Sequence, residues 1–153
     1  MRWVLKHFSE LDLNELYKIL RIRNEVFIVE QNCPYQDCDN KDLDAYHIYC
    51  EVNGEIGVYS RILRRGVSYE EASIGRVLSN EKFRGKKLSK ECMKRAIDFI
   101  ENELDEGKIR ISAQEYAKGF YEKVGFKKIS EVYLEDDIPH VEMLYENNKK
   151  QKF

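Results

Sequence analysis

The chain has 153 residues, of which 42% are hydrophobic, and its 28 acidic residues nearly balance its 26 lysines and arginines. These values fit one domain of ordinary size with one core, and the charge balance argues against a nucleic-acid-binding protein, which would carry a basic excess. No apolar run is long enough to cross a bilayer, and early charges interrupt the N-terminal segment, so we expect no membrane partner, no signal peptide and a cytoplasmic location.

The first segments of the chain predict a strand followed by a helix. Residues 2–8 have a strand pattern, and Asp12 with Glu15 three residues later resembles a capping box that opens a helix. Apolar side chains then recur at helical spacing, at Leu13, Leu16, Leu20 and Phe27, with Ile19, Ile22 and Val26 widening the stripe. After Glu30 this period is lost, and we expect a polar loop as far as Asp44.

The middle of the chain predicts three antiparallel strands. Residues 45–52 and 55–63 flank Asn53-Gly54, a dipeptide typical of tight hairpins because both of its positions need a positive φ. A polar loop around Gly66 precedes the third strand, at residues 72–79.

The last part of the chain predicts two helices and three strands. A helix with a wide apolar face spans about residues 84–104, and residues 108–113 form a short strand. A shorter helix ends at Gly125, and residues 126–134 and 139–145 form a final hairpin.

This element order predicts a mixed α/β fold with a mostly antiparallel sheet and helices on both faces. The strand, helix and strand at the centre form a crossover, which makes strands four and five parallel neighbours. We expect a single domain at residues 1–146 and a basic tail at 147–153. None of the four cysteines forms a Cys-x-x-Cys pair or has a histidine nearby at zinc-ligand spacing, so we expect free thiols and no metal.

One turn carries the main chemical signal. Residues 80–89 join a strand directly to a helix, where several unpaired backbone N–H groups point outward at the positive end of the helix dipole. A pyrophosphate fits such a site, Gly85 permits close approach, and Arg84, Lys86 and Lys87 add positive charge. The alternative is a solvated basic turn, but cations at a helix N-terminus oppose the dipole, which favours the anion site.

Here the sequence resembles the GNAT N-acetyltransferase superfamily, whose motif is Arg/Gln-x-x-Gly-x-Gly/Ala. Arg84 matches the first position, Lys87 stands where the family usually has glycine, and Ser89 stands where it has glycine or alanine. Residues 119–126, Gly-Phe-Tyr-Glu-Lys-Val-Gly-Phe, resemble the family's second motif, and Gln114 stands where many members have asparagine.

Further matches indicate the ElaA-type branch of this superfamily, at residues 23–37, 75–77 and 138–140. Together the matches cover roughly residues 20–144, in the family's order, which is more specific than one glycine motif. The family fold agrees with the order of strands and helices predicted independently.

The resemblance implies direct transfer of an acetyl group from acetyl-CoA to a primary amine. In this interpretation the backbone of Val77, Leu78 and Ser79 pairs with the pantetheine arm, and strands four and five splay to admit it. The N–H groups of residues 86–89 (Lys86, Lys87, Leu88 and Ser89) hold the pyrophosphate, and Gln114 contacts the cofactor. Tyr121 occupies the family's position for the general acid that protonates the leaving thiolate.

The resemblance leaves the acceptor side open. Glu30, His47, His140 and Glu142 are candidate general bases, and a chain of waters is an alternative to each. Arg61 and Arg76 either bind an acidic substrate group or pair with carboxylates such as Glu51. The acidic loop at residues 30–44 either attracts a cationic amine or is simply solvated. We assign acceptor contacts to Glu30, Gln31, His47, Arg76 and His140.

Two classes of function, an enzyme and an acyl-CoA-binding domain, stand beside a plain interaction module, which the absence of any thermal shift with CoA ligands would support. The first is an N-acetyltransferase whose acceptor is a small molecule, such as a polyamine or aminoglycoside, or a protein amine. The second is a non-catalytic acyl-CoA-binding sensor or adaptor, although retention of Tyr121 favours the enzyme. An exposed sheet edge leaves a homodimer open.

Overall fold

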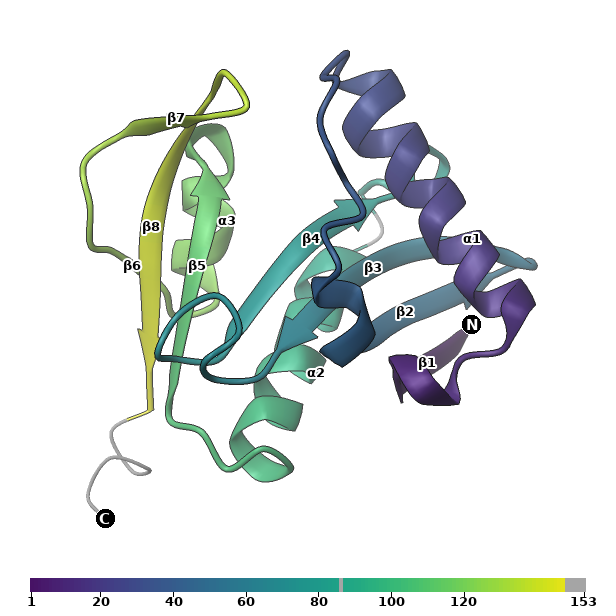
Figure 1. Ribbon diagram of the computed structural model, residues 1–153, viewed down its shortest axis with the longest axis horizontal. Helices are drawn as coiled ribbons and strands as arrows, with labels where there is room; N and C mark the ends of the chain where they lie inside the picture. The colour runs from purple at the N-terminus through teal and green to yellow at the C-terminus, as the bar shows by residue number, and fades with distance from the viewer. Residues whose placement is uncertain (86, 148–153) are drawn as a thin grey trace.

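A computed structural model describes residues 1–85 and 87–147, and Figure 1 shows their arrangement. The basic residues of the expected tail, and Lys86 in the expected phosphate turn, lie outside the described residues. The strands are β1 (Arg2–His7), β2 (Tyr46–Val52), β3 (Glu55–Leu63), β4 (Ser73–Ser79), β5 (Lys108–Gln114), β6 (Lys127–Lys128), β7 (Tyr133–Glu135) and β8 (Ile138–Glu146). The α-helices are α1 (Leu13–Arg23), α2 (Leu88–Asn102) and α3 (Lys118–Lys123), and a π-helical turn, η2 (Asn24–Glu30), extends α1.

The strands form two antiparallel groups. The first is a four-stranded sheet in the order β1-β2-β3-β4, and the second pairs β8 with β5 on one side and with β6 and β7 on the other. The Asn53-Gly54 turn joins β2 to β3 with φ angles of 52° and 80°, as its sequence predicts. The turn between β7 and β8 likewise has positive φ, at Asp136 and Asp137.

The two groups meet where β4 begins. Ala72, just before β4, forms an isolated parallel bridge with Ile109 of β5, and its carbonyl accepts a hydrogen bond of 2.9 Å from the Arg110 N–H. Beyond this bridge β4 and β5 diverge (Figure 1). The parallel pair predicted from the sequence is therefore limited to this single bridge, and β4 is the last strand of its own sheet.

The helices cover opposite faces of the four-stranded sheet, which gives the molecule two apolar clusters. Ile48, Cys50 and Val58 of the sheet pack in one cluster with α2, which contributes Cys92, Met93, Ala96, Ile97 and Ile100. Tyr49 and Tyr59 of the same strands pack in the other cluster with α1 and η2. Successive strand residues point to opposite faces, so β2 and β3 serve both clusters.

Helix α1 buries a different stripe from the one expected. Asp12 caps the helix by accepting from the Glu15 N–H at 2.7 Å, which confirms the capping box, but Leu13 is 85% exposed. Glu15 is buried instead, where Lys6 Nζ and Tyr49 Oη donate to its carboxylate at 3.0 and 2.9 Å. The buried apolar residues are those that the sequence pattern treated as flanking the stripe, namely Ile19, Ile22 and Val26, together with Phe27.

A network of three arginines and three aspartates fixes the loop that follows η2. Arg23, Arg61 and Arg76 come from α1, β3 and β4, and Asp37, Asp39 and Asp42 come from the loop. These three loop aspartates therefore turn inward rather than serving as free surface charge. Of the two alternatives for Arg61 and Arg76, the structure shows ion pairs, with these aspartates and not with Glu51.

Asp42 is the centre of this arginine–aspartate network. Its Oδ1 accepts from Arg23 Nη1 at 2.7 Å and from Arg61 Nη1 at 2.9 Å. Burial by itself would raise the pKa of Asp42, but the two guanidinium groups outweigh it and hold that pKa below its usual value. Arg23 is fully buried, so loss of this carboxylate would leave its charge only partly paired.

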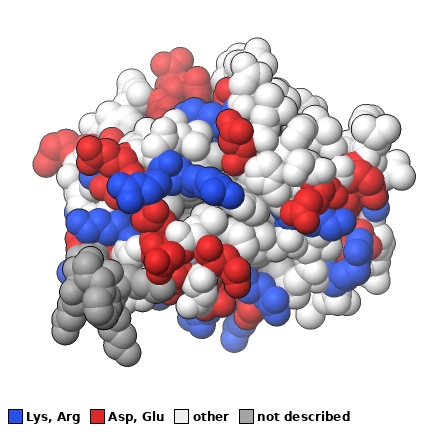
Figure 2. Space-filling view, turned by 60° about the horizontal axis from the view of Figure 1, so that its bottom comes forward, with Lys and Arg blue, Asp and Glu red and all other residues white. Residues whose placement is uncertain are grey.

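The charge pattern elsewhere agrees with the near balance of the sequence. Acidic and basic side chains lie interspersed on the face shown in Figure 2. Within residues 1–85 and 87–147, no helix is long and apolar enough to cross a membrane. All four cysteines have free thiols, and Cys92 lies in the core as expected.

We expect Asp42→Asn to lower the free energy of unfolding by about 3 kcal/mol at neutral pH, because it breaks a buried charge network. The depressed pKa of Asp42 means that its contribution is complete above about pH 4, the pKa of an unfolded aspartate, and is lost at lower pH. In urea unfolding between pH 7 and pH 3, the difference between wild type and variant should therefore shrink below about pH 4.

Asp44→Asn is the matched control, because Asp44 is exposed in the same short helical turn, η3 (Lys41–Asp44). It should change stability by less than about 0.5 kcal/mol. A difference between wild type and Asp42→Asn that stays constant down to pH 3 would contradict the assigned role of the Asp42 charge.

Candidate active site

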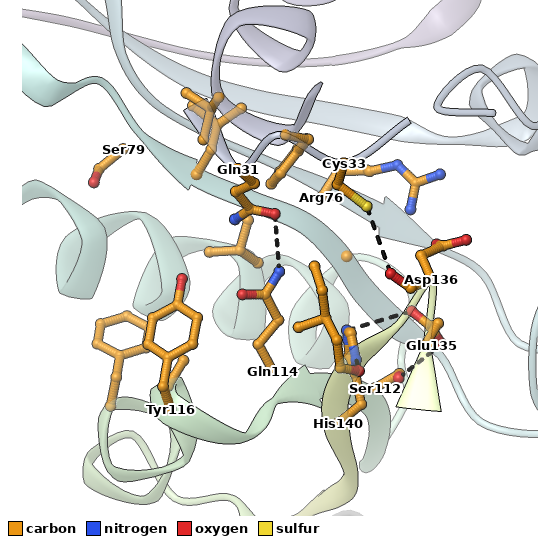
Figure 3. A pocket seen from close by; sticks show the side chains of 18 of the residues that line it. Gln31, Cys33, Arg76, Ser79, Ser112, Gln114, Tyr116, Glu135, Asp136 and His140 are labelled. Carbon is orange, nitrogen blue, oxygen red and sulfur yellow. Dashed lines mark hydrogen bonds and ion pairs between the residues drawn. The ribbon is translucent and has the colours of Figure 1, made fainter. Parts of the chain in front are cut away.

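A pocket of about 580 Å³ lies where β4 and β5 separate. β4 forms one wall from Ile74 to Ser79, and Ser112 and Gln114 of β5 form another (Figure 3). Residues of η2 and the loop after it, the start of α3, and the turn between β7 and β8 complete the lining. The pocket volume is in the range typical of small-molecule sites.

A β-bulge in β4 shapes this wall. Tyr59 pairs with Leu78 and Arg61 pairs with Gly75, so two residues of β4 stand opposite the single residue Ser60. One of the two is Arg76, whose φ of 51° lies in the left-handed region. Such a conformation costs a residue with a side chain about 1–3 kcal/mol, and strained residues outside turns cluster at functional sites.

Ion pairs hold the Arg76 side chain at the bulge. Its Nη2 donates to the Asp37 carbonyl at 2.9 Å, and its Nε lies 2.8 Å from Asp37 Oδ1, although without hydrogen-bond geometry. Nη2 also lies 3.4 Å from Asp39 Oδ2. The Arg76 charge is therefore already compensated inside the network.

Among the residues that the structure describes, no strand pairs with the pocket-facing edge of β4 after Ala72. Val77, Leu78 and Ser79, which the resemblance assigned to the pantetheine arm, all line the pocket on this edge. An unpaired strand edge presents a row of N–H and C=O groups that an extended ligand can pair with. This wall thus suits a linear ligand with amide groups.

Helix α2, which follows the turn predicted to hold a phosphate, begins later than expected. The helix starts at Leu88 rather than near Arg84, because Gly85 and Lys87 have φ angles of 85° and 61°, both left-handed. Lys87 therefore adopts the backbone conformation that glycine favours, at the position where the family motif has glycine. Its side chain is exposed, Leu88 is buried in the core, and Ser89 lines the pocket.

Arg84 lines the pocket and bonds to two of the other segments that form it. Its Nη2 donates to the Ser79 carbonyl at 3.1 Å and to Glu30 Oε1 of η2 at 2.9 Å. Both side chains line the pocket. An anion bound at the start of α2 would therefore compete with Glu30 for the Arg84 guanidinium.

Tyr121 lies in α3 with its side chain buried against Phe120 and Phe126. It lines the pocket, as does the neighbouring Tyr116, which is 81% exposed. Burial, with a smaller contribution from Tyr116, raises the pKa of Tyr121 well above its usual value. The hydroxyl is thus protonated at neutral pH, as a proton donor must be.

A bridge of two amides crosses the middle of the pocket. Gln114 Nε2 of β5 donates to Gln31 Oε1 at 3.3 Å. In Figure 3, Ser79 and Tyr116 lie on one side of this bridge, and Cys33, Glu135 and His140 lie on the other. We call the first the Ser79 side and the second the His140 side.

The structure brings most of the acceptor residues assigned from the sequence to the pocket, but not His47. Glu30, Gln31, Arg76 and His140 all line it. His47 is fully buried elsewhere, with Nδ1 2.7 Å from Tyr59 Oη and Nε2 3.1 Å from the Asp42 carbonyl, and burial lowers its pKa. Its role in the structure is to support the loop.

Sequence reasoning missed several lining residues, chiefly Ser112, Tyr116 and Glu135. Ser112 could have been predicted from the sequence, because it lies two residues before Gln114 on the same strand and therefore on the same face. Glu135 could not have been predicted, because its position depends on the register of the β7–β8 hairpin. Among the described residues, no group of three or more metal-ligating side chains lies together.

Comparison with known proteins gives a consistent result. The sequence matches the family described as "Acetyltransferase (GNAT) domain" over residues 8–147. It is 39% identical to protein ElaA of Escherichia coli over 148 residues, which cover 95% of this chain and 97% of that one, and the ElaA crystal structure has a TM-score of 0.87. An acyl-CoA N-acyltransferase from Pseudomonas aeruginosa is 40% identical with a TM-score of 0.88, covering 95% and 99% of the two chains.

Two substitutions in the turn before α2 should change the free energy of unfolding in opposite directions. Lys87→Gly should raise the free energy of unfolding by about 0.5–1 kcal/mol, because glycine adopts the left-handed conformation without strain. Gly85→Ala should lower it by about 1–2 kcal/mol, although the new methyl group would touch nothing within 4 Å, because the φ of 85° is strained for alanine. Urea unfolding measures both, and a change of the same sign in both variants would contradict this account.

Proposed function

Because the chain belongs to the GNAT acetyltransferase family, we propose that it transfers an acetyl group from acetyl-CoA directly to a primary amine. One observation carries the proposal: a single pocket joins the unpaired edge of β4, the turn at Arg84 and the buried hydroxyl-bearing ring of Tyr121. Acyl-CoA use and acyl transfer follow from the family, and the acetyl donor and the amine acceptor are the proposed specifics.

The residues present suit an acyl-CoA. The unpaired backbone of Val77–Ser79 can pair with the amides of a pantetheine arm, and the start of α2 together with Arg84 can hold a pyrophosphate. Ser79 and Arg84 meet through a hydrogen bond, so the two parts of the binding wall are continuous. The acyl group then reaches the middle of the pocket, near the Gln31–Gln114 bridge.

In this proposal Tyr121 donates a proton to the leaving sulfur. A raised pKa keeps the hydroxyl protonated, but it also makes Tyr121 a weaker acid. Transfer is favourable when Tyr121 regains a proton from the attacking nitrogen in the same step, because that nitrogen becomes positively charged as it bonds to carbon. A backbone N–H on β4 can stabilise the oxygen that carries the developing negative charge.

We expect Tyr121→Phe to slow CoA release at least about 100-fold while leaving acetyl-CoA affinity unchanged, because only the proton donor is lost. The assay follows thiol release from acetyl-CoA with a polyamine, an aminoglycoside and a lysine-containing peptide, and calorimetry measures binding. Tyr116→Phe is the matched control, since it removes a tyrosine hydroxyl from the same pocket. Acetyl-CoA binding without release for any amine would instead support an acyl-CoA sensor.

Glu30→Gln should tighten CoA binding about two- to fivefold, more at low salt, because it removes the carboxylate that competes for Arg84. The half-exposed ion pair limits the size of the effect. Glu25→Gln is the matched control, because Glu25 is exposed on η2 and does not line the pocket. Weaker CoA binding by Glu30→Gln would show that Glu30 supports the cofactor site rather than competing with it.

A further inference from the structure

His140 is the histidine that the fold places in the pocket, on the His140 side of the amide bridge (Figure 3). It lies on β8 directly opposite Gln114 of β5 in the strand register. Side chains of paired residues project from the same face of a sheet, which sets His140 beside the bridge. Only 6% of His140 is exposed, so its ring is shielded from bulk water.

The contacts of the ring determine which nitrogen is free. Nδ1 lies 2.6 Å from the Ile138 carbonyl, which can only accept, so Nδ1 carries the hydrogen. The ring also stacks on Tyr133, with centroids 6.2 Å apart and planes at 24°. In the neutral ring Nε2 then carries a lone pair, and the ring is held in one orientation.

Glu135 connects this nitrogen to solvent. Its Oε2 lies 3.5 Å from His140 Nε2, and its Oε1 accepts from Ser112 Oγ at 3.1 Å. The Glu135 side chain is 49% exposed, whereas the His140 side chain is 8% exposed. A carboxylate in this position can take a proton from the ring and pass it outward.

We propose that His140 is the general base that takes a proton from the acceptor amine, and that Glu135 passes this proton to solvent. The inference rests on the proposed function and deepens it. His140 is a catalytic residue in this scheme, because it touches the reacting amine, and Glu135 is a positioning residue that acts through His140.

The proton balance of the reaction supports two separate proton-transferring groups, a base and an acid. The acceptor enters as an ammonium ion and gives one proton to Nε2, which frees the nitrogen lone pair. That pair forms the C–N bond, the C–S bond breaks with its electrons on sulfur, and Tyr121 protonates the sulfur. Tyr121 recovers its proton from the new C–N nitrogen, so one proton per turnover remains on His140 and leaves through Glu135.

The other candidate bases do not lie on the His140 side of the pocket. Glu142 pairs with Arg110 at 2.9 Å, and His47 lies outside the pocket. Glu30 bonds to the same Arg84 nitrogen as the Ser79 carbonyl and so lies on the Ser79 side. Two titratable groups of β7, Tyr133 and Glu135, contact the His140 ring. Asp136 from the next turn, Cys33 from the loop after η2 and Arg76 from β4 line the same side of the pocket (Figure 3).

This arrangement identifies a class of acceptor. Glu135 and Asp136 line this side, and the Arg76 charge is compensated by Asp37 and Asp39, so the site favours a cation. A base inside the pocket lets the enzyme bind the abundant protonated form of a strongly basic alkylamine. Weakly basic amines, which are already neutral in solution, do not need this base.

The test compares wild type with His140→Gln in the thiol-release assay from pH 5.5 to 9, using the fastest amine of the panel, then n-butylamine and trifluoroethylamine. We expect kcat/KM of the variant to fall about 100-fold near neutral pH with the basic amines. At pH values where kcat/KM of wild type levels off, kcat/KM of the variant should still rise about tenfold per pH unit. The reason is that the variant reacts only with amine that is already neutral in solution. The deficit should shrink with trifluoroethylamine, and imidazole should partly restore His140→Ala.

Controls separate this role from a structural one. Glu135→Gln should lower kcat/KM about tenfold with the basic amines and less with trifluoroethylamine, because it removes the group that passes the proton outward, whereas Glu131→Gln, an exposed glutamate before the same hairpin, should change neither. Melting temperature and acetyl-CoA affinity report folding of each variant. If wild type releases CoA but His140→Gln keeps its pH profile and amine dependence, the inference is wrong and the proposed function stands. If wild type releases no CoA with any amine, the proposed function itself fails.

Discussion

β4 parts from β5 after one backbone bridge at Ala72, and the unpaired strand edge that results shapes everything else in the pocket. Unpaired N–H and C=O groups in a half-buried cleft are unfavourable unless a ligand or water satisfies them. The bulge at Arg76 lies in this part of β4, and a bulge bends its strand locally. The binding wall is thus a property of backbone topology more than of particular side chains.

The arginine–aspartate network offsets the strain of this arrangement. Arg76 is held in a left-handed conformation, and its side chain is tied to a loop that Arg23 and Arg61 in turn anchor to α1 and β3. The same loop carries Cys33 and Tyr35 to the pocket. The charges of the arginine–aspartate network, which the sequence alone would allow to contact substrate, are therefore used for structure. Glu135 and Asp136 then set the charge of the His140 side.

The two sides of the Gln31–Gln114 bridge have different chemical character. The Ser79 side combines strand backbone, a helix start and an arginine, and suits an extended anionic ligand. The His140 side combines an oriented imidazole with carboxylates, and suits a cation that must lose a proton. An acyl transfer between two such ligands needs its donor and acceptor to meet in the middle, near Gln114.

The sequence by itself determined the mixed α/β class, the hairpin at Asn53-Gly54, the cap at Asp12 and the family, because these depend on local backbone preferences and on motif spacing. It also identified Tyr121, Gln114 and the β4 wall as candidate site residues through resemblance, and their chemical roles stay predictions. The sequence did not show that Glu15 replaces Leu13 in the core, that α2 starts at Leu88, or that His47 lies away from the pocket.

Those points depend on partners distant in the chain. Glu15 is buried because Lys6 and Tyr49 meet it, and the loop aspartates turn inward because arginines of three other elements converge on them. Likewise His140 gains its place from register with Gln114 and its orientation from Ile138. A periodic pattern shows which face a side chain occupies, but only tertiary packing decides which charge it meets, and that choice separates a structural residue from a chemical one.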